Sequence, residues 1–229
     1  FAFLPRKFKI AVCGSREDRA AIHSHDICLE IVPGPTGENG FRVLVGGGLG
    51  RTPVIGSEIR PFLERRHLLS YLEAILRVYN LHGRRDNKYK ARIKILVKAM
   101  GVEAFTAAVE AEWERLRDGP ATLPDAEIDR IAAFFSGPAY ATLDAAGEAA
   151  VLEAHCAGEP IFANWVRRNS HAHRVPGYRA VTVSLKATGN PPGDISAVQL
   201  DRLADLCEAY SLGQLRTTHQ QNIVLADVR

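Results

Sequence analysis

The sequence predicts an α+β fold: a mixed or antiparallel sheet with helices, followed by a smaller α+β unit. Three observations carry this prediction. Short β-prone runs open the chain, helical periodicities follow them, and a strand–helix–strand–strand order fills about the last 50 residues. The composition, with 46% hydrophobic and 24% charged residues, is ordinary for a folded protein and excludes wholesale disorder.

The first elements are strands. Residues 8–12, 27–32 and 41–45 are rich in Ile, Val, Leu and Phe. The second and third strands flank a stretch rich in Gly and Pro, residues 33–40, so we expect them to form a hairpin. The third strand ends in the glycine run 46–50.

Helices are expected next. Apolar residues recur at helical spacing over 68–79, with Gly83 as the stop, and again over 91–99, ended by Gly101. A third helix is predicted over 105–116. The Ala-rich, acidic residues after it, up to about position 160, are interpreted as short helical pieces in a peripheral or linking region.

The last segment predicts half of a ferredoxin-like unit. Strands are expected over 180–185, 215–218 and 222–226, with a helix over 200–207. Such a half-unit leaves an apolar sheet face and an edge uncovered, and so it favours a partner copy. Because the chain also begins at Phe1, we expect it to be a piece of a longer protein.

Positive charge is concentrated in the first part of the chain. Residues 1–99 hold 18 Lys and Arg against 9 Asp and Glu, residues 100–160 hold 3 against 12, and residues 161–229 hold 8 against 5. This distribution favours an anionic partner, which can be a phosphate, a carboxylate-bearing cofactor, a small oxyanion or nucleic acid.

Two lysines on the first predicted strand are candidate anion ligands. Lys7 and Lys9 alternate with Phe8, so the lysines should share one face while Phe8 faces the other. Two ammonium groups held on one face repel each other, and an anion opposite them would offset this repulsion. An edge strand guarded by lysines against aggregation is the equally favoured alternative.

The glycine run and the basic segment that follows are further candidates. Residues 45–51 allow close backbone approach to a ligand, but Arg51 stands where a dinucleotide fingerprint needs Gly, and a tight turn without a ligand is the alternative. In residues 83–94 only Asp86 offsets the Arg and Lys residues. Arg84, Lys88 and Arg92 would share a face if helix extends through this segment.

No metal site is expected within the chain. The two His-x-His pairs, 23–25 and 171–173, lack a Cys or carboxylate at ligand spacing beside them. The four cysteines are far apart, which is typical of buried apolar residues in a reducing compartment, so a cytoplasmic location is expected. No apolar run is long enough for a membrane span.

A final polar cluster, residues 215–222, lies between the last two strands. It offers one guanidinium and several amide and hydroxyl donors, which suit bidentate anion recognition or, equally, a polar hairpin loop.

Taken in order, these pieces resemble the siroheme-containing nitrite and sulfite reductases. The resemblance rests on Pro-Arg-Lys-Phe-Lys (5–9), Leu-Val-Gly-Gly-Gly-Leu (44–49), Gly-Arg-Arg-Asp-Asn-Lys-Tyr-Lys-Ala-Arg (83–92) and Arg-Thr-Thr-His-Gln-Gln-Asn (216–222). It covers nearly all of the chain except roughly residues 118–160. By resemblance, residues 1–165 would be a siroheme-binding catalytic repeat, and residues 166–229 a ferredoxin-like half-domain.

The resemblance implies part of an assimilatory sulfite reductase, which reduces sulfite to sulfide by six electrons at a siroheme coupled to a 4Fe-4S cluster. Nitrite reduction to ammonia is the alternative. The electron donor would be ferredoxin or an NADPH flavoprotein, and no nucleic-acid or membrane partner is expected. The cluster cysteines of the family would lie outside this chain, which would then be incomplete for activity.

The resemblance also implies residue roles. Lys7 and Lys9 would face the substrate and act in catalysis. Residues expected to bind the cofactor are Arg6, Gly46, Gly47, Gly48, Leu49, Arg51, Arg85, Asn87, Lys88, Lys90, Arg92, Arg216, Gln220 and Asn222. A rival of another class is an RNA-binding ferredoxin-like module. The lack of aromatic residues on the terminal strands disfavours it, because such sheets generally stack bases on aromatics.

Overall fold

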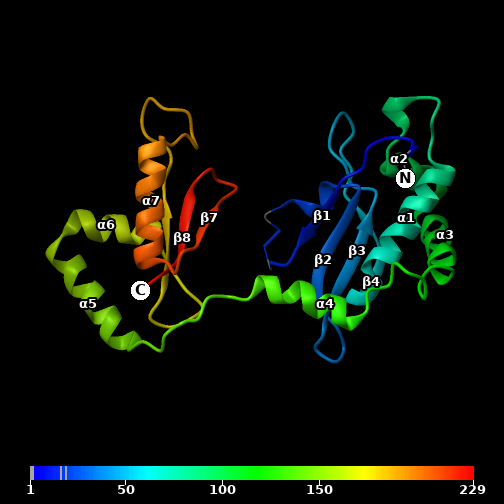
Figure 1. The fold of residues 1–229 in the computed structure, drawn as a ribbon. Coiled ribbons are helices and arrows are strands. Elements are labelled where there is room, and N and C mark those ends of the chain that lie inside the picture. Colours follow the sequence, from blue (N-terminus) through cyan, green and yellow to red (C-terminus); the bar gives the residue numbers. More distant parts are fainter. Residues whose placement is uncertain (1–2, 16, 19) are drawn as a thin grey trace. The chain divides into compact units, whose positions relative to one another are not determined.

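The computed structural model describes residues 3–15, 17–18 and 20–229. The chain forms two compact units, Phe1–Ser136 and Gly137–Arg229 (Figure 1). Each unit has its own sheet and its own apolar core. Within the described residues, no helix has both the length and the apolar character needed to cross a bilayer.

The first unit is built on a four-stranded sheet of order β1-β2-β3-β4. Its strands are β1 (Ile10–Cys13), β2 (Ile27–Pro33), β3 (Asn39–Val45) and β4 (Ser57–Glu64). β1 runs parallel to β2, whereas β2, β3 and β4 pair antiparallel. The predicted mixed sheet and the hairpin around residues 33–40 are therefore confirmed.

Three helices cover one face of this sheet (Figure 1): α1 (Leu68–His82), α2 (Ile93–Met100) and α3 (Val102–Glu114). Apolar strand residues such as Leu29 and Val43 pack against helix residues such as Ile75 and Phe105, all buried. The prediction of three helices after the strands is confirmed, since α1 ends before Gly83 and α2 before Gly101.

The placement of the two lysines was wrong, and one strand of this unit was missed. β1 begins at Ile10, so Lys7 and Lys9 lie in the segment just before it rather than on it. The sequence also missed β4, because Pro61 within it argues against a strand. Proline is tolerated there since β4 is an edge strand, which needs no N–H donor on its open side.

The basic segment does not extend a helix, so the expected shared face of Arg84, Lys88 and Arg92 does not form. Gly83 ends α1, and Arg84 pairs with Asp86. The Asn87 side chain accepts from the Tyr89 amide and so begins a separate 3-10 turn, Lys88–Lys90. Local side chain–backbone bonds of this kind compete with helix.

A short helix and a 3-10 turn close the first unit: α4 (Asp125–Ala132) and Ala133–Phe135. The second unit begins with α5 (Ala145–Gly158) and α6 (Pro160–Asn169). The region after α3 is therefore helical, as expected, but α5 runs through Gly147 as one 14-residue helix rather than as short pieces. The compact units divide after Ser136, and residues 137–165 pack with the second sheet.

The second sheet has the order β5-β6-β8-β7. Its elements are β5 (Ser170–Ala172), β6 (Arg179–Val183), α7 (Ala197–Tyr210), β7 (Leu215–Thr217) and β8 (Ile223–Val228). The order β6–α7–β7–β8 confirms the predicted strand–helix–strand–strand unit. The three-residue β5 was missed, because its sequence Ser-His-Ala has no β-prone residue.

Candidate functional site

The segment that carries Lys7 and Lys9, here called the lysine segment, lies just before β1 and is held through its backbone. The Lys9 amide donates to Asp26 Oδ2 at 2.9 Å, and the Lys9 carbonyl accepts from the Ile27 amide at 3.1 Å. Phe8 packs against the core, whereas the side chains of Lys7 and Lys9 are exposed. Although β1 starts later than expected, the predicted separation of Phe8 from the two lysines is present.

Asp26 joins three of the predicted segments. It is fully buried, and its carboxylate receives a bidentate pair from Arg92, with Nε to Oδ1 at 2.9 Å and Nη2 to Oδ2 at 2.5 Å. Its backbone carbonyl accepts from the Gly46 amide at 2.9 Å. One residue therefore contacts the lysine segment, the glycine run and the basic segment.

Tyr79 of α1 provides a second link. Its buried hydroxyl lies 3.0 Å from the Arg6 carbonyl and 2.5 Å from the Ala91 carbonyl. Burial raises the pKa of Tyr79 above its ordinary value, which keeps the hydroxyl protonated as a donor. Arg6 itself donates through Nη1 to the Lys88 carbonyl at 2.8 Å. The lysine segment and the basic segment thus lie side by side.

The glycine run approaches the chain's own backbone. Gly46 has φ +80°, a conformation that favours glycine. A Cβ on Gly47 would lie 2.3 Å from the His23 carbonyl oxygen, so the close approach at this position is to residues 23–25. Farther along, Lys94 Nζ donates to the carbonyls of Leu49 at 3.2 Å and Thr52 at 2.7 Å, which fixes the exposed end of the run to α2.

The predicted side chains of the first unit fall into two groups. The first group has partners within the protein and comprises Arg6, Arg85, Asn87 and Arg92. The second group has exposed cations with no hydrogen bond or ion pair to any described residue: Lys7, Lys9, Arg51, Lys88 and Lys90. Of these, Lys88 lies 5.3 Å from the ring centroid of Tyr89. Of the other predicted residues of this unit, Leu49 is exposed, and Gly46, Gly47 and Gly48 are buried.

The exposed cations of the second group can attract and hold an anion. The five unpaired cations of the second group lie on the three segments that Asp26 and Tyr79 bring together. Unpaired ammonium and guanidinium groups on neighbouring segments produce a positive potential that a carboxylate or oxyanion would neutralise.

The remaining predicted residues, Arg216, Gln220 and Asn222, belong to the second unit. Arg216 is exposed, with Nη2 3.4 Å from Gln214 Oε1. Lys186 Nζ donates to the Gln220 carbonyl at 2.6 Å and to Asn222 Oδ1 at 2.5 Å. Gln220 and Asn222 therefore hold a lysine at the end of the β7–β8 hairpin.

The cysteines do not form a ligand set. Cys13 and Cys28 lie in a small apolar cluster with Ile22 and Leu44, whereas Cys207 lies in the core of the second unit. Burial raises the pKa of the Cys28 thiol to about 11. Among the described residues, no group of three or more His, Cys, Asp or Glu side chains could hold a metal ion.

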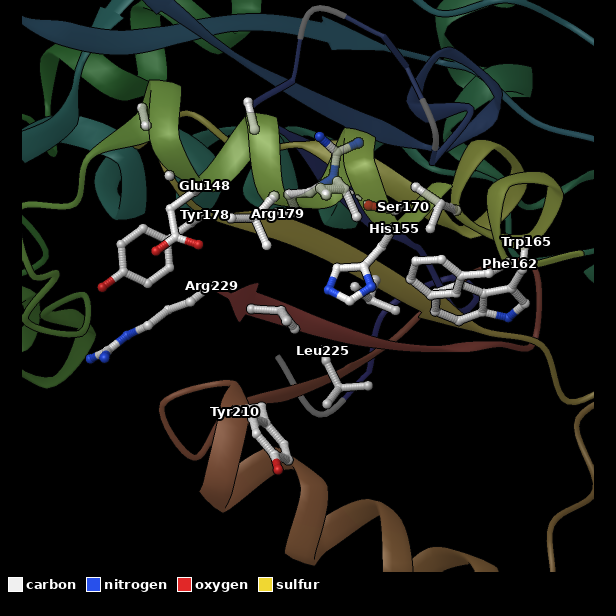
Figure 2. Close-up of a pocket in the computed structure, with 18 of the residues that line it drawn as sticks. Glu148, His155, Phe162, Trp165, Ser170, Tyr178, Arg179, Tyr210, Leu225 and Arg229 are labelled. Carbon is white, nitrogen blue, oxygen red and sulfur yellow. Dashed lines mark hydrogen bonds between the residues drawn. The ribbon is translucent and has the colours of Figure 1, made fainter. Parts of the chain in front are cut away.

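A cavity of about 520 Å³ opens in the second unit between α5, α6 and the sheet (Figure 2). Its walls are largely apolar and aromatic, with Phe162, Trp165, Tyr178 and Tyr210 among the lining residues. None of the predicted site residues lines this cavity. The unpaired cations of the first unit therefore remain the better candidate site.

The sequence did not identify the residues that assemble the site. Asp26 and Tyr79 carry no motif, and Lys94 was noted only as one cation of the basic segment. The available signal was indirect: a cation-rich segment needs counter-charges, and Asp26 is an acidic residue directly before a predicted strand. Asp26 and Tyr79 contact residues far away in the sequence, and these contacts form only in the folded chain.

Two family models match this chain. The model of the nitrite and sulphite reductase 4Fe-4S domain matches residues 1–116, and the model of the nitrite/sulfite reductase ferredoxin-like half domain matches residues 171–229. Together the two models match most of the chain.

Curated relatives include sulfite reductase (ferredoxin) 2 of Mycolicibacterium paratuberculosis, 34% identical over all of this chain and 34% of the relative. The chloroplastic ferredoxin–nitrite reductase of Oryza sativa is 28% identical over 99% of this chain and 32% of the relative. The solved structure of the Mycobacterium tuberculosis NirA protein shares the fold, with a TM-score of 0.60 at 24% identity, and the match covers 100% of this chain and 34% of that one. The chain thus spans about a third of the length of these proteins.

Proposed function

The chain belongs to the nitrite and sulphite reductase family, and we propose that it supplies the substrate-side lysines of a longer enzyme that reduces sulfite to sulfide. The observation that carries this proposal is the set of unpaired cations on three segments joined by Asp26. The 34% identical sulfite reductase of Mycolicibacterium paratuberculosis supports sulfite as the substrate.

The residues present fit one of the two cofactors of the family. Siroheme carries several carboxylates, and the unpaired side chains of Arg51, Lys88 and Lys90 are the donors that would hold them. Gly46 to Leu49 would pack beside them. The described residues offer no ligand set for the 4Fe-4S cluster, so its ligand cysteines would lie in a part of the longer enzyme outside this chain.

The siroheme, when bound, would pass the electrons of the donor to the oxyanion and provide the site at which the oxyanion ligates. The chain's own lysines would bind the substrate and donate protons to it. Lys7 and Lys9 are exposed and without described partners, so their ammonium groups are free to bind sulfite and to donate protons as its oxygens leave as water. Their charge would also stabilise the negative charge that develops on the reacting oxyanion.

Three further proposals follow from this assignment. The catalytic repeat is proposed to span residues 1–165 and the half-domain residues 166–229. The family models over 1–116 and 171–229 support a division between positions 116 and 171, whereas residues 137–165 pack in the same compact unit as the half-domain. Ferredoxin is the electron donor, as the names of the relatives suggest. The cytoplasm is the proposed compartment, because the four cysteines are free thiols.

Nitrite reduction to ammonia is the second candidate, favoured by the Oryza sativa relative. The experiment that separates the two is purification of the full-length protein, followed by visible spectroscopy, iron analysis and turnover with each oxyanion. We expect siroheme absorption and faster turnover of sulfite. Faster turnover of nitrite would reverse the substrate assignment, and a colourless, iron-free protein would refute the proposed function.

A further inference from the structure

The predicted role of Arg92 conflicts with its surroundings. By resemblance Arg92 would contact the cofactor, yet its guanidinium is already engaged on two nitrogens by the Asp26 carboxylate. The Arg92 side chain is 17% exposed and that of Asp26 is 0% exposed. Releasing Arg92 to an external carboxylate would leave the buried Asp26 charge without its counter-charge, which is unfavourable.

The same carboxylate fixes the backbone of Lys9. Oδ2 of Asp26 accepts from the Lys9 amide, and the next residue, Ile27, donates its amide to the Lys9 carbonyl. Both backbone groups of Lys9 are therefore held by residues 26 and 27. The Lys9 side chain stays exposed and unpaired, so this contact orients the lysine without using its charge.

The carbonyl of Asp26 adds a third contact, because it accepts from Gly46 at the start of the glycine run. A residue that contacts Lys9, Gly46 and Arg92 sets the spacing between the lysines and the cofactor-side segments. Arg92 in turn fixes the carboxylate, since a bidentate pair restricts its orientation.

We propose that Asp26 is a positioning residue for Lys9, and that Arg92 acts by holding the Asp26 carboxylate rather than by binding the cofactor. This inference rests on the proposed function, in which Lys9 binds the substrate. Of this pair, Arg92 ends the motif of residues 83–92, whereas Asp26 lies outside every motif that carries the family resemblance.

The first test is amide hydrogen exchange in the full-length protein, followed by mass spectrometry of peptides that contain Lys9. Asp26→Ala removes the acceptor, and we expect exchange of the Lys9 amide to become about tenfold faster or more. Arg92→Met frees the carboxylate and should accelerate the same amide. Asp86→Asn is the matched control, because Asp86 makes a bidentate pair with Arg84 at the surface, with distances of 2.6 Å and 2.8 Å.

The second test separates positioning from cofactor binding. We expect Asp26→Ala and Arg92→Met each to raise KM for sulfite several-fold with the siroheme content unchanged, and the double variant to be no worse than either single one. Asp26→Asn retains an acceptor for the Lys9 amide, so its KM and its Lys9 exchange should stay closer to those of the wild type. If Asp26→Ala does not fold, Arg92→Met supplies the same test.

The outcomes are distinguishable. Unchanged Lys9 exchange in folded Asp26→Ala, or loss of siroheme in Arg92→Met with Lys9 exchange unchanged, would overturn the positioning role. Additive effects of the two substitutions on KM would overturn it as well. The exchange measurement does not need siroheme, so a protein without siroheme would refute the proposed function while the exchange data still decide the role of Asp26.

Discussion

Asp26 is separated from its partner Arg92 by 66 positions in the chain, and the two nevertheless form an ion pair in which the Asp26 side chain is 0% exposed and that of Arg92 is 17% exposed. Burying two charges is costly unless they are paired and hydrogen-bonded, and Asp26 satisfies this condition with Arg92 and the Lys9 amide. At the scale of single residues, the site therefore consists of paired charges that build it and unpaired charges, such as Lys7 and Lys9, that remain free to act.

The exposed lysines give the first prediction at this scale. Lys9→Met in the full-length protein should lower turnover of sulfite by about a hundredfold, because a proton donor and an oxyanion ligand are lost together. Thermal unfolding should change little, since the Lys9 side chain is exposed and unpaired. Lys98→Met, at an exposed lysine of α2, is the control. Wild-type kinetics in Lys9→Met would remove the catalytic role.

Cys28 gives a second prediction, concerning pH. Burial raises the pKa of its thiol from 9.0 to about 11 in the folded state. A raised pKa means that the folded protein holds this proton more tightly than the unfolded chain. Its contribution to stability is therefore full below about pH 9 and is lost as the pH rises to about 11.

The measurement is the free energy of unfolding at several pH values for the wild type and for Cys28→Ala. We expect the wild type to lose more stability than Cys28→Ala between about pH 9 and pH 11. Cys156→Ala, at a partly exposed cysteine of α5, should keep the wild-type slope. Identical slopes in all three proteins would contradict the assignment.

At the scale of elements, Glu110 joins α3 to β4 and α1. It accepts from Arg60 Nη1 at 2.6 Å and from the Tyr71 hydroxyl at 2.7 Å. Burial, followed by the hydrogen bond to Glu110, raises the pKa of Tyr71 well above its ordinary range, so the hydroxyl stays a donor. The Arg60 guanidinium also lies over the Trp113 ring, 4.4 Å from its centroid.

Glu110→Gln should therefore lower the free energy of unfolding by about 1–3 kcal/mol, because Arg60 loses its counter-charge while partly buried. Urea unfolding followed by circular dichroism measures this. Glu114→Gln changes an exposed glutamate at the end of α3 that pairs with Arg117 in the following turn, and its expected effect is below about 0.5 kcal/mol. Equal effects of the two substitutions would contradict the joining role of Glu110.

At the scale of the whole molecule, the two units have separate cores, and the second unit is closed by its own polar contacts. The Tyr140 hydroxyl donates to the buried Asp227 carboxylate at 2.6 Å, and His173 Nε2 lies 3.4 Å from the same oxygen. These contacts fasten residues near 140, which precede α5, to β8. The second unit is thus larger than its strand–helix–strand–strand part.

Tyr140→Phe should destabilise the second unit, since it deprives the buried Asp227 carboxylate of a donor. Hydrogen exchange should then accelerate in β6 and β8 while exchange in β2 and β3 stays as in the wild type. Tyr210→Phe, which alters an exposed tyrosine of α7, is the control. Faster exchange across both units would show that they do not open independently.

Local pattern determined much of the fold. Periodic apolar residues and the stops at Gly83 and Gly101 predicted α1 and α2, and the Gly- and Pro-rich stretch 33–40 predicted the β2–β3 hairpin. These features depend on residues close together in the sequence, so they can be predicted from the sequence alone. The same holds for the concentration of cations before residue 100, which pointed to an anionic partner.

Only the tertiary structure decided which of those cations are free. Arg6, Arg85 and Arg92 have the same chemistry as Arg51 in the sequence, but the fold gives the first three internal partners and leaves Arg51 exposed. It also decided that Pro61 lies in an edge strand. Hydrogen bonds and ion pairs between distant residues form only when the chain closes, because their geometry is set by packing rather than by spacing along the sequence.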